Sequence, residues 1–224
     1  LGRSLADMLI ADLGEAGDVR VVARPTMEAA RRTLDLPRSG PIDAKTARAI
    51  AAELGASFVV AAALKQEGEV FHLAASVYPA DASQAAFPIT SKAARDDFDA
   101  IEKTLLTETL RGIGLSPSRA RLQRLLEPHT TSLVAALAYG AAIDALDAGE
   151  TAKAESALSA ALSEDRNFVR ARDMMLQIRG TGAKAATVAD SAVAAAFAEA
   201  EKWLVECAEM GACERLAGFA NSPP

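Results

Sequence analysis

The chain has 224 residues, half of them hydrophobic, and a formal net charge of −6 at pH 7. This charge gives no overall attraction to nucleic acid or anionic lipid, and aromatic residues at 4% offer few surfaces for base stacking. No apolar run approaches the ~20 residues that span a bilayer. We therefore expect no nucleic-acid partner and no transmembrane segment, and the length suits two domains of ~100 residues each.

An amphipathic helix and then a β run are predicted at the start of the chain. Leu5, Leu9 and Leu13 fall on one helical face, and Gly17 follows where that pattern ends. The run at 19–24, with the sequence VRVVAR, is rich in β-branched residues and is typical of a strand. The sequence thus predicts a helix followed by a strand.

The next elements are predicted from hydrophobic alternation and turn residues. A polar, glycine-containing link at 67–69 between two β runs indicates a hairpin. Pro88 cannot donate to a β ladder, so we expect the last β run at an edge of the sheet. After a long loop carrying Pro37 and Pro41, we expect a helix at 43–55, strands at 57–64, 70–78 and 85–90, and a helix at 98–110.

Three segments in this order, 5–10, 19–24 and 51–60, resemble the amino-terminal domain of TolB and the periplasmic domain of the curli secretion protein CsgG. The resemblance covers about residues 1–115 and implies an α/β domain with a small mixed sheet. That family begins with an apolar strand, whereas this chain starts at Leu1, almost on the first helix. We therefore expect a fragment whose first strand, with any export signal or lipid anchor, lies upstream.

The second half of the chain is rich in alanine, and no strand is predicted there. A basic run at 119–126 predicts an amphipathic linker helix. Helical segments at 132–146 and 151–162 are joined around Gly149, which predicts a helical hairpin. Alanine favours helix and allows helices to approach closely, so this half is expected to be all-α.

The hairpin resembles part of a tetratricopeptide repeat, with a generic alanine-rich bundle as the alternative. The resemblance rests on the spacing of Gly149, Ala154, Leu158 and Ala161. One repeat cannot bury its own face, so helices at about 168–178 and 185–210 are expected to complete the stack. The expected fold is α+β or α/β followed by an all-α tetratricopeptide-like domain, divided into 1–115, a linker helix and loop at 116–131, and 132–224.

The residues that usually carry chemistry are sparse. His72 and His129 are the two histidines, and neither lies in sequence near a cluster of metal-ligand residues. The chain has no phosphate loop, no dinucleotide-binding fingerprint and no nucleophile elbow. We therefore expect no catalysis, metal or cofactor. Cys207 and Cys213 are expected to form a disulfide in an oxidising compartment, with two separate thiols as the alternative.

The resemblance implies a non-catalytic protein-interaction component of the bacterial cell envelope, periplasmic and associated with the outer membrane, that serves assembly or transport. Its partners would be envelope proteins or peptides, and a ring-forming homo-oligomer is one alternative. Two further hypotheses are a regulatory or sensor domain of a bacterial signalling protein and an enzyme with an unrecognised site. Expected contact residues are Arg20, Arg24, Arg38, Tyr139 and Ile143, although Tyr139 fits a core position as well and we prefer the core.

Overall fold

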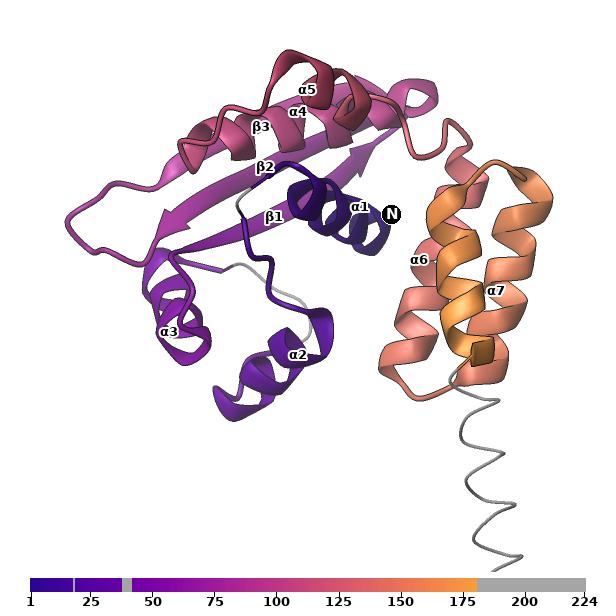
Figure 1. Cartoon of the computed structure of the whole chain (residues 1–224), viewed down its shortest axis with the longest axis horizontal. Helices are drawn as coiled ribbons and strands as arrows, with labels where there is room; N and C mark the ends of the chain where they lie inside the picture. Colours follow the sequence, from indigo (N-terminus) through magenta and orange to yellow (C-terminus); the bar gives the residue numbers. More distant parts are fainter. Residues whose placement is uncertain (18, 38–41, 181–224) are drawn as a thin grey trace, which may run out of the picture. The chain divides into compact units, whose positions relative to one another are not determined.

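The computed structural model describes residues 1–17, 19–37 and 42–180 (Figure 1). The chain divides into two compact units, Leu1–Met174 and Met175–Pro224. The first unit is mixed α+β and contains the sheet and the labelled helices. None of the helices in the described ranges is long and apolar enough to cross a membrane.

A three-stranded antiparallel sheet forms the centre of the unit. Its strands β1 (Phe58–Glu67), β2 (Val70–Pro79) and β3 (Phe87–Ala94) lie in the order β1-β2-β3. In the register, Val60 pairs with Val77 and Ala75 pairs with Ile89. The three predicted β runs are confirmed, and Pro88 lies in an edge strand as expected.

One face of the sheet forms the main core. Alternate residues of β2 are buried there, from Phe71 to Val77, because successive side chains of a strand point to opposite faces. Helix α4 (Phe98–Gly112) packs on β2 and β3, and α1 (Gly2–Glu15) contacts α4. The C-terminal end of α4 lies very close to the strands. A Cβ added to Gly112 would lie only 2.9 Å from the Phe87 ring.

Helix α3 (Ala44–Leu54) packs against the opposite face near one end of the sheet, where Val59 and Tyr78 are paired. Asp43 caps this helix by accepting a 2.7 Å hydrogen bond from the Thr46 backbone N–H. Gly55 ends it in the left-handed conformation that glycine adopts without strain. The predicted helix at 43–55 is therefore confirmed.

The predicted strand at 19–24 is wrong. Residues 19 to 23 have no regular structure, and Arg24 begins a helix, α2 (Arg24–Thr33), in a region that we predicted as loop. Pro25 in the first turn suits a helix start. Because 19–24 forms no ladder, the sheet in the described part is antiparallel throughout and not the mixed sheet that we expected.

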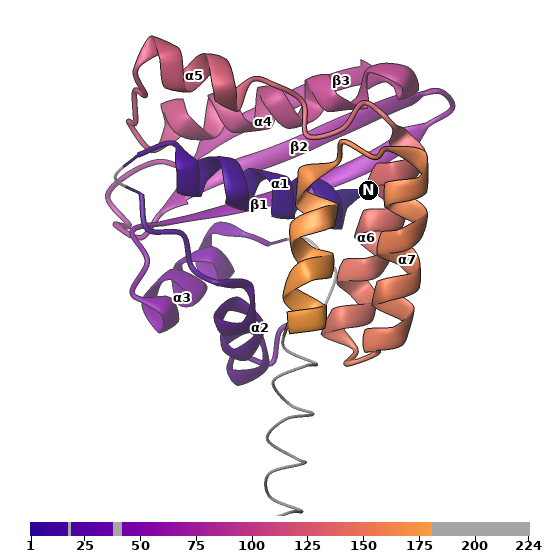
Figure 2. The same ribbon diagram turned by 45° about the vertical axis from the view of Figure 1, so that its right-hand side comes forward.

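Three further helices follow α4 and match the prediction. They are α5 (Arg119–Leu125), α6 (Leu133–Asp147) and α7 (Thr151–Glu164), and residues 169–180 are also helical. Helices α6 and α7 lie side by side as a hairpin that turns at Gly149, whose φ is +77° (Figure 2). The tetratricopeptide-like assignment and the domain division remain predictions, and the helix predicted at 185–210 lies outside the described residues.

Helix α1 also contacts α6, far along the chain. The Ser4 hydroxyl donates a 2.5 Å hydrogen bond to the Ala136 carbonyl, and Ser4 is fully buried. Gly140 permits this approach, because a Cβ there would lie 2.8 Å from the Ser4 oxygen. Helix α1 therefore joins the α/β part of the unit to the helical hairpin.

We predict that Gly140→Ala lowers the free energy of unfolding by about 1–2 kcal/mol, because the new methyl group forces the Ser4 hydroxyl from its carbonyl partner. This loss exceeds the gain in helix propensity from replacing glycine. Gly14→Ala in α1 is the matched control, since a Cβ added there would meet no heavy atom within 4 Å, and it should be neutral or stabilising by up to about 1 kcal/mol. Urea unfolding of both variants measures the difference, and a Gly140→Ala protein as stable as the parent would contradict the close packing.

Candidate functional site

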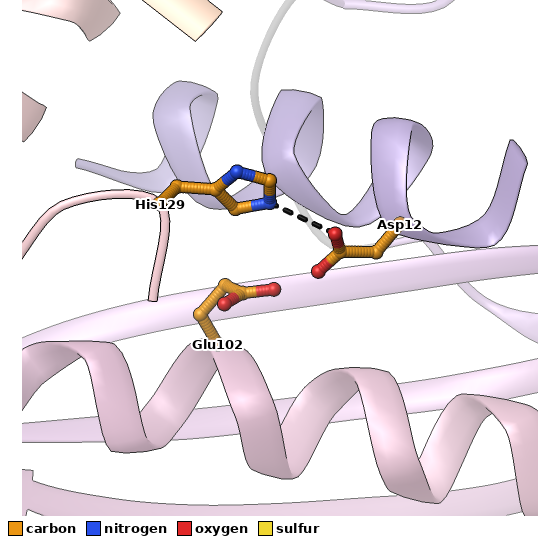
Figure 3. Close-up of side chains that lie close together, drawn as sticks. All are labelled: Asp12, Glu102 and His129. Carbon is orange, nitrogen blue, oxygen red and sulfur yellow. Dashed lines mark hydrogen bonds and ion pairs between the residues drawn. The ribbon is translucent and has the colours of Figure 1, made fainter. Parts of the chain in front are cut away.

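A buried cluster of charged side chains lies between α1, α4 and the loop that precedes α6 (Figure 3). Asp12 comes from α1, Glu102 and Lys103 from α4, and His129 from the loop. The Nε2 atom of His129 lies 2.9 Å from Oδ1 of Asp12. Figure 3 shows Glu102 extending from α4 toward this imidazole–carboxylate pair. Ligand atoms of Asp12, Glu102 and His129 all lie within 4.8 Å of one another.

Local packing explains how the two acids come to be buried. Asp12 lies on the same helical face as Leu5 and Leu9, and Glu102 follows Ile101 in the part of α4 that faces the core. The two residues are only 4% and 2% exposed. Burying a carboxylate is costly unless it is paired, so these positions require nearby partners.

Lys103 supplies most of that pairing. Its ammonium lies 2.7 Å from Oε2 of Glu102 and 3.1 Å from Oδ2 of Asp12. It also donates a 2.8 Å hydrogen bond to the Leu125 carbonyl at the end of α5. The cluster therefore links α1, α4, α5 and the following loop through a single ammonium group and one imidazole.

The pKa values of the two carboxyl groups are shifted in opposite directions. Burial raises the pKa of Glu102 to about 8, against the opposing effect of Lys103. Burial also acts to raise the pKa of Asp12, but the hydrogen bond and charge of His129, together with a hydrogen bond to Glu102 and the charge of Lys103, lower that pKa below its ordinary value. The cluster can thus hold a proton on Glu102 near neutral pH while Asp12 stays ionised.

One oxygen of the cluster has no partner. Oε1 of Glu102 is buried and accepts no hydrogen bond, although a hydrogen bond between the carboxyl groups of Glu102 and Asp12 contributes to the pKa shifts of both. Most buried polar atoms are hydrogen-bonded, so an orphan acceptor beside an imidazole and a second carboxylate marks a place where a proton or cation would be stabilised. Chemically, the arrangement can retain a proton or coordinate a cation.

A second polar cluster lies where α1 meets the helical hairpin. Oδ2 of Asp7 accepts hydrogen bonds from the Tyr139 hydroxyl and the Arg170 guanidinium, each at 2.6 Å. Burial, with the Asp7 charge next, raises the pKa of Tyr139, so its hydroxyl remains a donor. The Tyr139 ring packs on Phe168 with centroids 4.9 Å apart. This cluster holds α1 against α6.

The predicted contact residues are not brought together. Tyr139 and Ile143 are fully buried, so neither offers a free surface for a partner, in agreement with the preferred core position of Tyr139. Arg24 forms an ion pair with Asp147 and so links α2 to α6, whereas Arg20 is exposed. Arg38 and the cysteines Cys207 and Cys213 lie outside the described residues.

The outward face of α6 carries an apolar row that the sequence prediction missed. Val134 and Leu137 are 56% and 44% exposed, and Ala141 is exposed one turn further along. Their spacing of three and four residues places them on one side of the helix. The alanine-rich sequence of α6 is apolar on nearly every side, so periodicity could not show which side lies in the core.

No protein-family model, curated protein or solved structure matches the chain. The resemblance to the TolB and CsgG domains therefore stays a hypothesis.

A signal for the charged cluster was present in the sequence. Asp12 and Glu102 each interrupt the apolar face of a predicted amphipathic helix, and an acid in such a position needs a buried partner. For His129, the neighbouring residues predict only a place at the start of a helix. His129 lies 117 positions after Asp12 in the sequence. Sequence motifs defined by residue spacing do not extend over such separations.

We predict that Glu102→Gln flattens the pH dependence of stability. The folded pKa of about 8 lies above the ordinary value of 4.5, so the protonated acid stabilises the fold below about pH 4.5 and this contribution is lost as the pH rises through 8. Between pH 5 and pH 8 the parent protein should lose more stability than Glu102→Gln, by on the order of 2 kcal/mol. Urea titrations at several pH values measure this.

Glu53→Gln, at an exposed position on α3, is the matched control and should keep the slope of the parent. Equal slopes for the parent and Glu102→Gln would show that Glu102 is ionised in the folded protein throughout this range.

Proposed function

We propose that this chain is a non-catalytic protein-interaction component of the bacterial cell envelope, whose partner binds the outward face of α6. The observation that carries the proposal is the apolar row of Val134, Leu137 and Ala141. Envelope placement is supported by the resemblance of residues 1–115 to the TolB and CsgG domains.

The composition of α6 supports binding at this face. A helix that is apolar on nearly all sides is normally covered on all sides. Here the inner side, with Tyr139 and Ile143, packs inside the unit, while Val134 and Leu137 remain exposed. Contiguous exposed apolar side chains on a surface helix are typical of interaction sites.

The inner contacts of α6 make its outer face a fixed platform. The Asp7–Tyr139–Arg170 cluster and the bond from Ser4 to Ala136 hold the helix against α1. Binding to a preformed face avoids the entropic cost of ordering it, and two or three apolar anchors can then carry much of the affinity. A partner segment with an apolar helical stripe has suitable chemistry.

Site-specific photo-cross-linking in the native host tests the proposal. With benzoylphenylalanine at position 137, we expect one discrete adduct with another envelope protein, identified by mass spectrometry. The same label at Glu53, exposed on α3, is the control and should give none. Equal labelling at both positions, or no adduct at 137, would contradict docking on α6, and an adduct only with a second copy would indicate a homo-oligomer.

We further predict that Val134→Ser removes the cross-link formed at position 137 while changing the free energy of unfolding by no more than about 0.5 kcal/mol, because the side chain is exposed.

Digestion by protease in spheroplasts, compared with intact cells, tests the envelope placement separately. Protection from protease until the inner membrane is lysed would contradict that placement and favour the signalling alternative.

A further inference from the structure

We propose that Asp12, Glu102 and His129 form a binding site for a divalent transition-metal ion of the zinc class. The ion would be held by Oδ1 of Asp12, Oε1 of Glu102 and Nε2 of His129. This inference is independent of the proposed docking function.

The geometry of the three groups suits one ion. Their ligand atoms lie within 4.8 Å of one another. Nitrogen and oxygen ligands around a tetrahedral zinc ion lie about 3.4 Å apart, so the widest pair would need to close by about 1.4 Å. The three side chains come from two packed helices and a loop. Metal binding would therefore require these side chains to change rotamer within that framework.

The orphan oxygen of Glu102 is an independent sign of a ligand. This side chain is 2% exposed and Oε1 has no hydrogen-bond partner. The side chain is directed at the Asp12–His129 pair, as Figure 3 shows. A buried acceptor without a partner costs about 1–3 kcal/mol. A metal ion at this point would supply a partner in place of a proton shared with Asp12.

Lys103 places a positive charge next to the proposed metal site. Its ammonium contacts Oε2 of Glu102 and Oδ2 of Asp12, the carboxylate oxygens on the other side of each group. The proposed ligand oxygens are therefore not the ones that Lys103 uses. Repulsion between the ammonium and a dication lowers the affinity, so the site should bind more tightly when this charge is removed.

The donor set defines the class of ion. One imidazole with two carboxylates favours zinc, cobalt or manganese over magnesium or calcium, which prefer sites made of oxygen alone. Three protein ligands leave a coordination position for water or for a group from another molecule. The site is therefore expected to bind metal at a partly open position.

Nuclear magnetic resonance of the two histidines tests the site without altering a ligand. The chain, stripped with chelator and carrying Cys207→Ser and Cys213→Ser to remove thiol ligands, is titrated with Zn²⁺. We expect Nε2 of His129 to shift with saturation near one equivalent, while His72, which is 44% exposed in its side chain beside Glu67, stays unchanged. A shift of both histidines together, or of neither, would overturn the proposal.

Calorimetry on variants of the same chain gives a second test. We expect Glu102→Gln and His129→Gln each to weaken Zn²⁺ binding by at least about tenfold, and His72→Gln, the matched control, to leave it unchanged. Lys103→Met should tighten binding severalfold if it remains folded by circular dichroism. Equal affinity in the parent and in Glu102→Gln would overturn the proposal, as would undiminished binding in His129→Gln.

Discussion

The structure depends on how α1 is buried. This helix buries its leucines and, at the same time, presents polar groups to two separate neighbours, α4 and α6. Asp12 joins it to α4 and to the loop before α6, while Ser4 and Asp7 join it to the hairpin. Buried polar groups are tolerated only with accurate partners, so these contacts fix the orientation of α1 more narrowly than apolar packing would.

The elements governed by local rules were predictable from the sequence. The hairpin of β1 and β2, the capped helix α3 and the turn at Gly149 each carry their own signal in adjacent residues, and each is formed as expected. The strand predicted at 19–24 was wrong because a strand depends on more than local residues. Its β-branched residues favour an extended backbone, but a strand also needs a neighbour, and β propensity does not supply one.

The candidate sites were less predictable, because they are assembled from distant parts of the chain. The acids on the faces of α1 and α4 indicated that partners were needed, but not that His129 would be one of them. In α6, alanines surround Tyr139 and Val134 alike, so composition could not separate the buried side from the exposed one. The side of such a helix that becomes buried depends on tertiary contacts, here the packing of α7 and the approach of Ser4 to Gly140.

The pairing of Ser4 with Ala136 has a consequence for biosynthesis. The two residues are 132 positions apart, so α1 leaves the ribosome long before its second neighbour is made. Until α6 emerges, Ser4 and Asp7 must be satisfied by water. Contacts of such large sequence separation also slow folding, because a long loop must close before they form. The polar face of α1 is therefore buried only after the chain has been synthesised as far as α6.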